Sequence, residues 1–306
     1  MQNILKYYKL KKNKKMKMMR NLLLLSAAVL MVASCGKAGG PVKKNIGLQM
    51  YSLRGPINDG AVGVDAVIAA IGNAGYKYVE SASYDDGKIY GMSPEEFKAK
   101  IEAAGMTALS CHVRQDLDAD MEAVWAWWDK CIATHKAAGM KYIVMPSMPD
   151  LDTVEGLQAY CDYFNQIGEK CAAAGLKFGY HNHDREFTTV YEDGTVMYDY
   201  MVQNTNPANV VFELDVYWSQ KGGRPAAELF KQYPGRFELL HVKDEKELGR
   251  SGYMNFEELF NNIDPATKYL VVEVEKYDLP EVESVKASLD YLNDAAFVKE
   301  DYSQKH

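Results

Sequence analysis

Histidine and acidic side chains gather at the ends of short apolar runs in this chain. Four of the six histidines lie there, at His112, His181, His183 and His241. The acidic residues in similar places are Glu80, Glu213, Asp215, Glu273 and Glu275. Imidazole nitrogens and carboxylate oxygens without thiolates suit manganese, zinc, iron or cobalt, and with fewer imidazoles magnesium. The pattern therefore predicts one divalent metal ion.

The spacing of these residues indicates how they would meet. Alternate side chains of a strand lie on one face, so His181 and His183 share a face, as do Glu213 and Asp215. An interior lined by imidazoles and carboxylates is costly unless a positive charge lies among them. A lone histidine or acid at a strand end is more often simply solvated, so the prediction depends on their convergence. His135, inside a helix-like stretch, receives no role.

Eight apolar runs rich in β-branched and aromatic residues predict the strands that must position these side chains. They are Ile46–Tyr51, Tyr76–Glu80, Met106–His112, Tyr142–Met145, Leu176–His181, Val210–Leu214, Phe237–Val242 and Tyr269–Glu273. The stretches with helical spacing are Ala61–Ala74, Pro94–Ala104, Asp120–Ala138, Val154–Ala174, Met197–Asn204, Pro225–Tyr233, Asn255–Asn262 and Val282–Leu292. Ala-Gly pairs before four strands predict helix ends, because glycine tolerates the left-handed conformation that closes a helix.

Strict alternation of strand and helix predicts a parallel sheet, and eight such units close a barrel. We therefore expect an α/β fold, a single (β/α)8 TIM barrel over residues 45–300. An open doubly wound sheet is the competing fold. It would usually place a glycine-rich phosphate loop after the first strand, where this chain has Tyr51-Ser52-Leu53-Arg54-Gly55-Pro56. A small hairpin is expected within residues 186–195.

The N-terminus has the pattern of a secretory signal. The basic stretch Lys11 to Arg20 precedes the apolar run Leu22–Val32 and then Ala33-Ser34-Cys35-Gly36. The apolar run is short for a bilayer span, which needs roughly 20 residues. Cys35 resembles the lipidated cysteine of bacterial lipoproteins, so residues 1–35 are expected to be a signal peptide and residues 36–44 a linker. An uncleaved anchor helix is the alternative.

Processing at Cys35 would leave an exported, strongly acidic protein held to the membrane by its lipid anchor only. Eight basic residues and no acidic one precede Cys35, so 27 basic and 42 acidic residues remain, a net charge near −15. Such a field repels polyanions, and nucleic acid is not an expected partner. The remaining cysteines are expected to be buried apolar residues: Cys111, Cys131, Cys161 and Cys171.

Several segments together resemble one enzyme family. They are Phe178-Gly179-Tyr180-His181-Asn182-His183, Phe212-Glu213-Leu214-Asp215-Val216-Tyr217-Trp218, Leu240-His241-Val242-Lys243-Asp244 and Val272-Glu273. The chain is similar there to the sugar phosphate isomerase/epimerase family of the xylose-isomerase-like TIM-barrel superfamily. That superfamily also holds endonuclease IV, inosose dehydratase and the ketose 3-epimerases. The resemblance extends from Ile46 to the last helix.

The resemblance implies one divalent metal ion with ligands from strands five to eight. These would be His181, Asp215, His241 and Glu273. Epimerases of the family often have glutamate at the place of His181, and their two ligand glutamates move a proton between the faces of the sugar carbon. Loss of one disfavours symmetric epimerisation and leaves one-base isomerisation, dehydration or β-elimination open.

The implied chemistry is removal of a proton next to a carbonyl. A divalent ion that holds the carbonyl and a neighbouring hydroxyl would stabilise the enediolate, and a carboxylate or imidazole would take the proton. Glu273 and His183 are the candidate bases. The candidates for substrate positioning or acid catalysis are Glu80, His112 and Lys243. Further candidates for sugar contact are Trp218, Tyr217 and Glu213.

An exported protein would rarely meet sugar phosphates, so the expected substrate is an unphosphorylated carbohydrate such as a keto-sugar or a 3-keto-glycoside. The expected reaction is isomerisation, epimerisation or elimination. The alternative is a carbohydrate-binding lipoprotein without turnover, although binding alone would not need all four ligands. Endonuclease activity would need a richer ligand set and a basic face. The oligomeric state is left open by the sequence.

Overall fold

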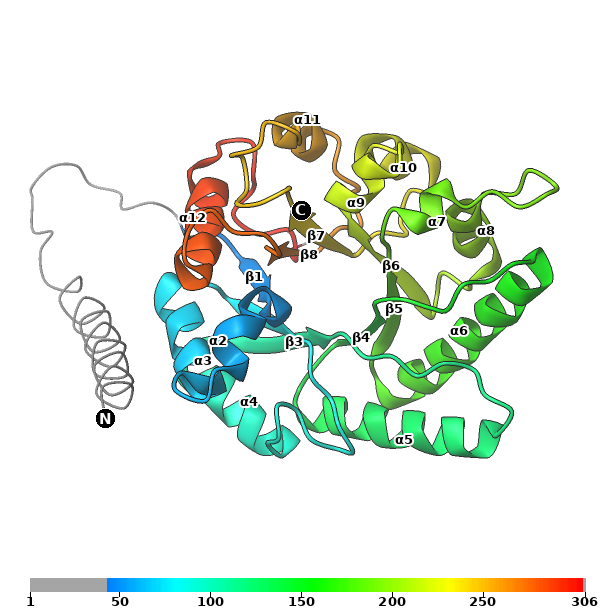
Figure 1. Ribbon diagram of the computed structural model, residues 1–306, viewed down its shortest axis with the longest axis horizontal. Helices are drawn as coiled ribbons and strands as arrows, with labels where there is room; N and C mark the ends of the chain where they lie inside the picture. Colours follow the sequence, from blue (N-terminus) through cyan, green and yellow to red (C-terminus); the bar gives the residue numbers. More distant parts are fainter. Residues whose placement is uncertain (1–42, 305–306) are drawn as a thin grey trace, which may run out of the picture. The chain divides into compact units, whose positions relative to one another are not determined.

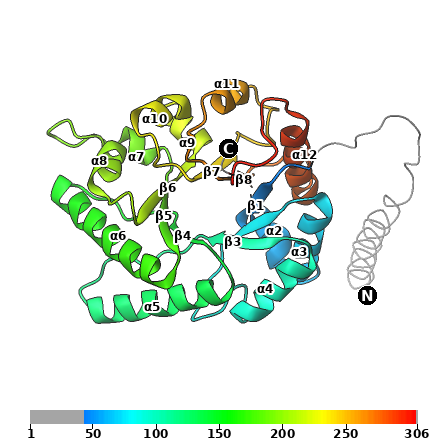
Figure 2. The same ribbon diagram turned by 180° about the vertical axis from the view of Figure 1, so that it is seen from behind.

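The computed structural model describes residues 43–304, so the expected signal peptide and Cys35 lie outside the described residues. Eight parallel strands form one sheet in the order β3-β2-β1-β8-β7-β6-β5-β4. A parallel bridge between His112 and Val144 joins the edges of β3 and β4 and closes the sheet. The strands lie at the centre and the helices surround them (Figures 1 and 2). The fold is the expected (β/α)8 barrel.

The strands and the outer helices alternate along the chain. The strands are β1 (Ile46–Gln49), β2 (Tyr78–Ser81), β3 (Thr107–Cys111), β4 (Tyr142–Met145), β5 (Lys177–His181), β6 (Val210–Asp215), β7 (Leu239–Lys243) and β8 (Tyr269–Glu273). The outer helices are α3 (Gly63–Ala74), α4 (Pro94–Ala103), α5 (Met121–Ala137), α6 (Val154–Ala174), α8 (Met197–Asn204), α10 (Ala226–Gln232), α11 (Phe256–Asn261) and α12 (Glu281–Asp294). Short helices within the loops are η1 (Met50–Leu53), α2 (Arg54–Asn58), α7 (Arg185–Thr188) and α9 (Val216–Lys221).

The predicted elements are present, with differences at strand ends and in one loop. β1 stops at Gln49 instead of Tyr51, because the Gln49 side chain accepts a hydrogen bond from the Tyr51 amide (2.9 Å) and starts η1. All four Ala-Gly pairs end a helix, with the glycine at positive φ. The expected hairpin at residues 186–195 is only a single bridge between Val190 and Val196, because α7 occupies the start of that loop.

The interior of the barrel changes in character from one end to the other. At the N-terminal end, Tyr269 packs edge to face on Tyr78 and Tyr142, with ring centroids 5.4 and 5.8 Å apart. Next come aliphatic side chains, namely Leu109, Val144, Val211, Leu239 and Val271. Towards the C-terminal strand ends the buried side chains become polar: Gln49, Glu80, His181, Glu213 and His241. The sequence thus builds an apolar plug under a polar layer.

The first strand is also fastened to the last helix. Lys44 is 6 % exposed, and its ammonium donates to the carbonyl oxygens of Leu292 (2.7 Å) and Ala295 (2.5 Å) at the end of α12. A cation there is favourable, because the last carbonyls of a helix carry partial negative charge. The cysteines at 111, 131, 161 and 171 are free and buried, as expected. Among the described residues, no helix is long and apolar enough to cross a membrane.

We expect Gly47→Ala to destabilise the barrel. A Cβ atom on Gly47 would lie 2.1 Å from the Tyr78 ring, which fills the barrel interior and has little room to move. Overpacking of this kind costs about 1–3 kcal/mol of the free energy of unfolding, which urea titration measures. Gly60→Ala is the control, because no atom lies within 4 Å of its added Cβ. Equal stability of the two variants would contradict the packing argument.

Candidate functional site

A cavity of about 400 Å³ opens at the C-terminal ends of the strands. Its wall includes residues just after β3, β5 and β8, among them His112, Arg114, His183 and Glu275. The active sites of TIM barrels lie at this end, in the loops that follow the strands. The cavity is therefore the place to look for chemistry.

The structure brings all four predicted metal ligands together beside this cavity, and two of them, His181 and Glu273, line it. His181, Asp215, His241 and Glu273 each offer one ligand atom, and these atoms lie within 4.8 Å of one another. Pairing between strands sets the arrangement, because Asp215 on β6 is the partner of His241 on β7. All four side chains are buried. They form the upper group of this site.

The atoms of the upper group suit a divalent cation. Asp215 accepts a hydrogen bond from the Trp218 amide through Oδ1 (2.8 Å), whereas its Oδ2 has no partner among the described residues. The Nδ1 atom of His241 also lacks a hydrogen-bond partner there and lies 3.4 Å from Glu273 Oε2, whereas His181 Nδ1 lies 3.3 Å from Glu213 Oε2 in the layer below. Burial raises the pKa of Asp215 to about 7. A cation would satisfy these buried oxygen and nitrogen atoms, and the donor set matches a transition-metal site.

A second layer of charged side chains lies under the upper group. Glu80 Oε1 is 2.7 Å from His241 Nε2 and also accepts a hydrogen bond from Gln49 (2.7 Å). Since Nε2 faces Glu80, the other ring nitrogen of His241 is directed towards the upper group. A carboxylate behind a ligand histidine fixes the ring orientation and its tautomer. Glu80 is therefore placed to orient His241.

His112 and Glu213 complete this lower layer. His112 Nε2 lies 2.7 Å from Glu213 Oε2 and 3.0 Å from Glu80 Oε1. Burial opposes charge on the imidazole, but these two carboxylates raise the pKa of His112 to about 9. Burial, together with the charge of Glu80, raises the pKa of Glu213 to about 7. The ligand atoms of His112, His181, Glu213 and His241 also lie within 4.8 Å of one another.

The positions of Glu80 and Glu213 differ from the sequence-based expectation. Both were expected to contact or position the substrate, but both are 0 % exposed and neither lines the cavity. Their carboxylates contact histidines below the upper group. Residues two apart on β6 point to the same side of the sheet at different depths, so Asp215 reaches the upper group and Glu213 the lower layer.

Lys243, Glu273 and Glu275 form a charged network beside the cavity. The Lys243 ammonium donates to Glu273 Oε2 (2.9 Å) and to Glu275, which is a lining residue. Burial would raise the pKa of Glu273, but Lys243 and His241 hold it well below its usual range. The same ammonium lies 5.6 Å from the centre of the Trp218 ring. The Lys243 side chain is thus only 3 % exposed, and its ammonium has two carboxylate partners.

His183 joins the cavity to an aromatic wall. Its backbone amide donates to Glu186 (2.7 Å), and its ring centroid is 5.5 Å from that of Trp218. Tyr217 packs against Trp218 at 5.1 Å. Burial lowers the pKa of the His183 imidazole, which favours its neutral form. These three residues therefore lie together just after the ends of β5 and β6, and His183 is the one that lines the cavity.

Sequence reasoning missed some residues of the cavity wall. Arg114, Ser147 and Tyr51 line the cavity but were not among the predicted site residues, and Glu275 was noted only as a member of the acidic pattern. Each follows a strand end by a few residues, which is the signal that could have found them. Nothing in the sequence, however, indicates which loop residues turn back over the barrel.

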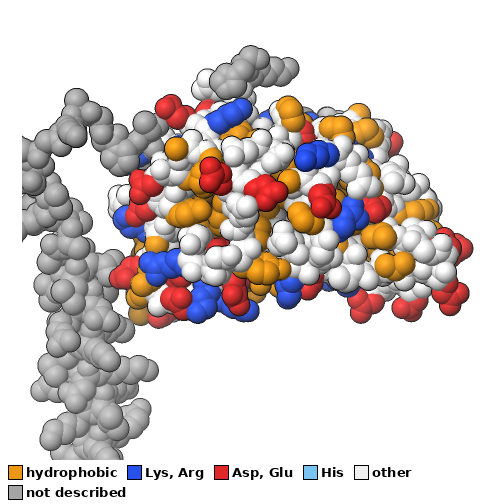
Figure 3. Space-filling model, turned by 90° about the horizontal axis from the view of Figure 1, so that it is seen from above, with side chains coloured by type: hydrophobic (Ala, Val, Ile, Leu, Met, Phe, Trp, Pro, Cys, Tyr) orange, Lys and Arg blue, Asp and Glu red, His pale blue; other side chains and the backbone are white. Residues whose placement is uncertain are grey.

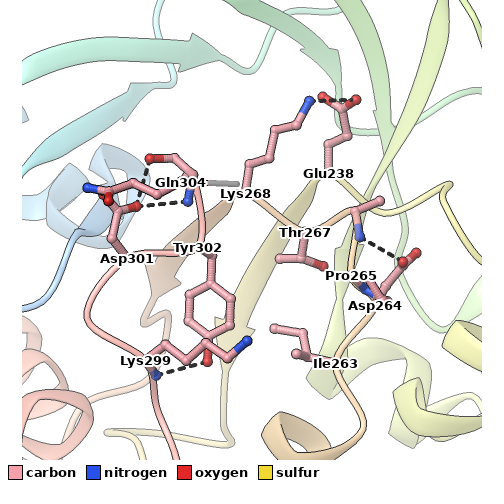
Figure 4. A pocket seen from close by; sticks show the side chains of 12 residues that line it. Glu238, Ile263, Asp264, Pro265, Thr267, Lys268, Lys299, Asp301, Tyr302 and Gln304 are labelled. Carbon is pink, nitrogen blue, oxygen red and sulfur yellow. Dashed lines mark hydrogen bonds and ion pairs between the residues drawn. The ribbon is translucent and has the colours of Figure 1, made fainter. Parts of the chain in front are cut away.

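A second cavity, of about 540 Å³, lies at the opposite end of the barrel. Its wall includes Glu238 and Lys268, which precede β7 and β8, and Tyr302 near the C-terminus. Figure 4 shows the Lys268 ammonium facing the Glu238 carboxylate, and the two are 3.1 Å apart. Active sites of TIM barrels lie at the C-terminal ends of the strands, and this cavity lies at the N-terminal ends, so we assign no catalytic role to it.

Charged side chains are mixed on the face of the molecule in Figure 3. Asp and Glu side chains alternate there with Lys and Arg, and apolar side chains lie singly or in small groups. That face has no extended basic area of the kind that binds the nucleic-acid backbone.

Comparison with known proteins identifies the family. The model of the xylose isomerase-like TIM barrel family matches residues 68–295, and the chain belongs to that family. A solved sugar phosphate isomerase/epimerase from Parabacteroides distasonis is similar, with a TM-score of 0.79, 30 % identity, and coverage of 88 % of this chain and 100 % of the other. Both the expected fold and the expected family are thus confirmed.

Two more distant relatives share part of the sequence or the fold. Inosose dehydratase from Geobacillus kaustophilus is 22 % identical over 218 residues, which are 63 % of this chain and 67 % of the relative. A protein called IOLI, solved with a bound zinc atom, shares the fold with a TM-score of 0.64 and 14 % identity, covering 82 % of this chain and 97 % of the other. The relatives named here thus include a sugar phosphate isomerase/epimerase and an inosose dehydratase.

His135 provides a test of a buried histidine outside the site. It is 0 % exposed, its Nδ1 donates to the Cys131 carbonyl (2.8 Å), and burial lowers its pKa to about 4. Between pH 6.5 and 4 the unfolded chain therefore binds a proton that the folded chain does not. The stability present above pH 6.5 is lost as the pH falls, by about 3 kcal/mol.

We expect His135→Gln to remove this dependence. Urea unfolding at pH 7 and pH 4.5 would show a smaller loss of stability in the variant than in the wild type. An equal loss in both proteins would mean that His135 does not titrate in this range.

Proposed function

We propose that this protein is a divalent-metal-dependent enzyme that removes a proton next to a carbonyl of an unphosphorylated carbohydrate. The observation that carries the proposal is the upper group, in which four buried residues bring ligand atoms within 4.8 Å of one another, and two of the four, His181 and Glu273, line the cavity. His181, Asp215, His241 and Glu273 would hold manganese, zinc, cobalt, iron or magnesium. When bound, such an ion would polarise the carbonyl of the substrate. Isomerisation, epimerisation and elimination all begin with that step.

His183 is the base that the geometry favours. Its imidazole lines the cavity, and burial keeps it neutral near pH 7, so it can accept a proton. Glu273, the other candidate, is ion-paired with Lys243. Burial alone would raise the pKa of Glu273, but the ion pair outweighs burial and keeps this pKa low. A carboxylate held in this way is a weaker base. We therefore assign Glu273 to metal binding and His183 to proton transfer.

Lys243 and the aromatic wall complete the proposed site. The ammonium of Lys243 is fixed by Glu273 and Glu275, beside the place where negative charge would develop. Trp218 lies next to both Lys243 and His183, and Tyr217 packs behind it. An aromatic face at this position suits the apolar face of a sugar ring. His112, which also lines the cavity, is held by Glu80 and Glu213.

The experiment that tests this function measures hydrogen exchange. Manganese-loaded protein in D2O should replace the α-hydrogen of a keto-sugar or a 3-keto-glycoside, as followed by NMR. His183→Asn should slow exchange by about 10²–10⁴-fold with unchanged metal content, because it removes a general base. Asp215→Asn should lose the metal, as measured by elemental analysis.

Glu238→Gln is the matched control, because Glu238 is a buried carboxylate at the opposite end of the barrel. It should keep both metal and exchange. Wild-type protein that fails to bind added manganese or zinc would refute the enzyme proposal. Metal binding without exchange of any sugar tested would favour the carbohydrate-binding alternative.

We further propose that the protein is exported and anchored by a lipid on Cys35, which lies outside the described residues. In a bacterial host, a palmitate analogue should label the wild-type protein but not Cys35→Ala, which should leave the membrane fraction. Cys111→Ala is the control, because Cys111 is buried at the end of β3 and should not affect labelling. Undiminished labelling of Cys35→Ala would exclude this anchor.

A further inference from the structure

One cation stands out in the wall of the cavity. Among the residues that line it, all of them in the described part of the chain, Arg114 is the one lysine or arginine. Its guanidinium is held by Asp116, with Nε 2.9 and 3.0 Å from the two carboxylate oxygens and Nη2 2.7 Å from Oδ2. Its Nη1 donates to Ser147 Oγ (3.1 Å), which also belongs to the cavity wall.

The charge of Arg114 is therefore already balanced. The Arg114 and Asp116 side chains are 39 % and 37 % exposed, so the pair lies at the mouth of the cavity. A phosphate or carboxylate on a substrate would have to compete with Asp116 for the guanidinium.

Two more cations lie near the wall without lining it. Lys243 is buried between Glu273 and Glu275, and Arg54 lies over the Tyr51 ring (4.5 Å) and donates to the carbonyl oxygens of Tyr51 and Glu275. An anionic group entering the cavity would thus meet acidic side chains, and the one guanidinium of the wall itself already has a carboxylate partner.

The hydrogen bonds of Arg114 point to a neutral ligand. A guanidinium carries five N–H groups. The contacts with Asp116 and Ser147 use one on Nε, one on Nη2 and one on Nη1, which leaves two. Two free donors on a charge-balanced pair can bind hydroxyl oxygens of a sugar without attracting an anion. A guanidinium without Asp116 would instead bind a phosphate with two parallel hydrogen bonds.

We propose that Asp116 is a specificity-determining residue, which neutralises Arg114 so that the cavity accepts neutral sugars and glycosides and rejects phosphorylated or acidic ones. The inference rests on the proposed function, because it takes the cavity to be the sugar-binding site. It adds a structural cause to the preference for unphosphorylated substrates, which the sequence suggested only from the expected export of the protein.

Calorimetric titration of the metal-loaded full chain tests this inference, with D-fructose 6-phosphate and D-fructose as probes. Wild-type protein should bind the phosphate no more tightly than the free sugar. Asp116→Asn should bind D-fructose 6-phosphate about tenfold more tightly or better, because one charged hydrogen bond contributes at least this much. The affinity for D-fructose, which carries no charge, should change much less than the affinity for the phosphate. The double variant Arg114→Gln/Asp116→Asn should lose the gain.

Asp199→Asn is the matched control. Asp199 binds Arg224 through two contacts (3.1 and 3.3 Å), and neither residue lines the cavity, so freeing Arg224 should not change phosphate binding. Thermal unfolding verifies that each variant is folded. Unchanged binding in Asp116→Asn, a gain that persists in the double variant, or tighter wild-type binding of the phosphate would overturn the inference. The two proposals can fail separately. If Asp116→Asn binds the phosphate more tightly but the wild-type protein exchanges no sugar hydrogen, the role of Asp116 is supported and the proposed enzymatic function is refuted.

Discussion

The rest of the site depends on the burial of carboxylates and imidazoles in one layer of the barrel. Glu80 and Glu213 are 0 % exposed, and their buried negative charge is compensated by the imidazoles of His112 and His241. Burial opposes charge on Glu80, yet these histidines hold its pKa well below the usual range. The layer costs desolvation energy, but it fixes the ring of His241 from below. A fixed ring presents the same nitrogen to the upper group at all times.

The apolar end of the barrel makes this arrangement possible. The rings of Tyr78, Tyr142 and Tyr269 fill the N-terminal end, and Gly47 leaves the space that the Tyr78 ring occupies. Water therefore has little access to the charged layer from below. Electrostatic interactions strengthen where water is excluded, so the ion pairs above the plug hold their partners firmly. The two ends of the barrel thus have separate tasks, one for packing and one for chemistry.

The sequence predicted the barrel from a repeating pattern, because alternation of strand and helix determines the fold. The rule that sites lie at strand ends placed Asp215, His241 and Glu273 among a longer list of candidates, and the family resemblance selected them as ligands. A period of two shows which residues share a face but not how deep each lies, so Glu80 and Glu213 were expected at the substrate rather than below it. Arg114 and Asp116 lie in a loop without regular structure, where spacing predicts neither distance nor direction.

The charges around the cavity also explain why a metal ion and a neutral substrate belong together. Asp215, Glu273 and Glu275 supply three negative charges in their ionised forms, and Lys243 supplies one positive charge between two of them. A divalent cation among the ligands would offset the negative charge that remains on these four side chains, while Asp116 balances Arg114 at the mouth. A phosphate would add charge that nothing in the wall offsets, whereas a neutral sugar leaves the balance unchanged. The same count therefore favours both the cation and an uncharged ligand.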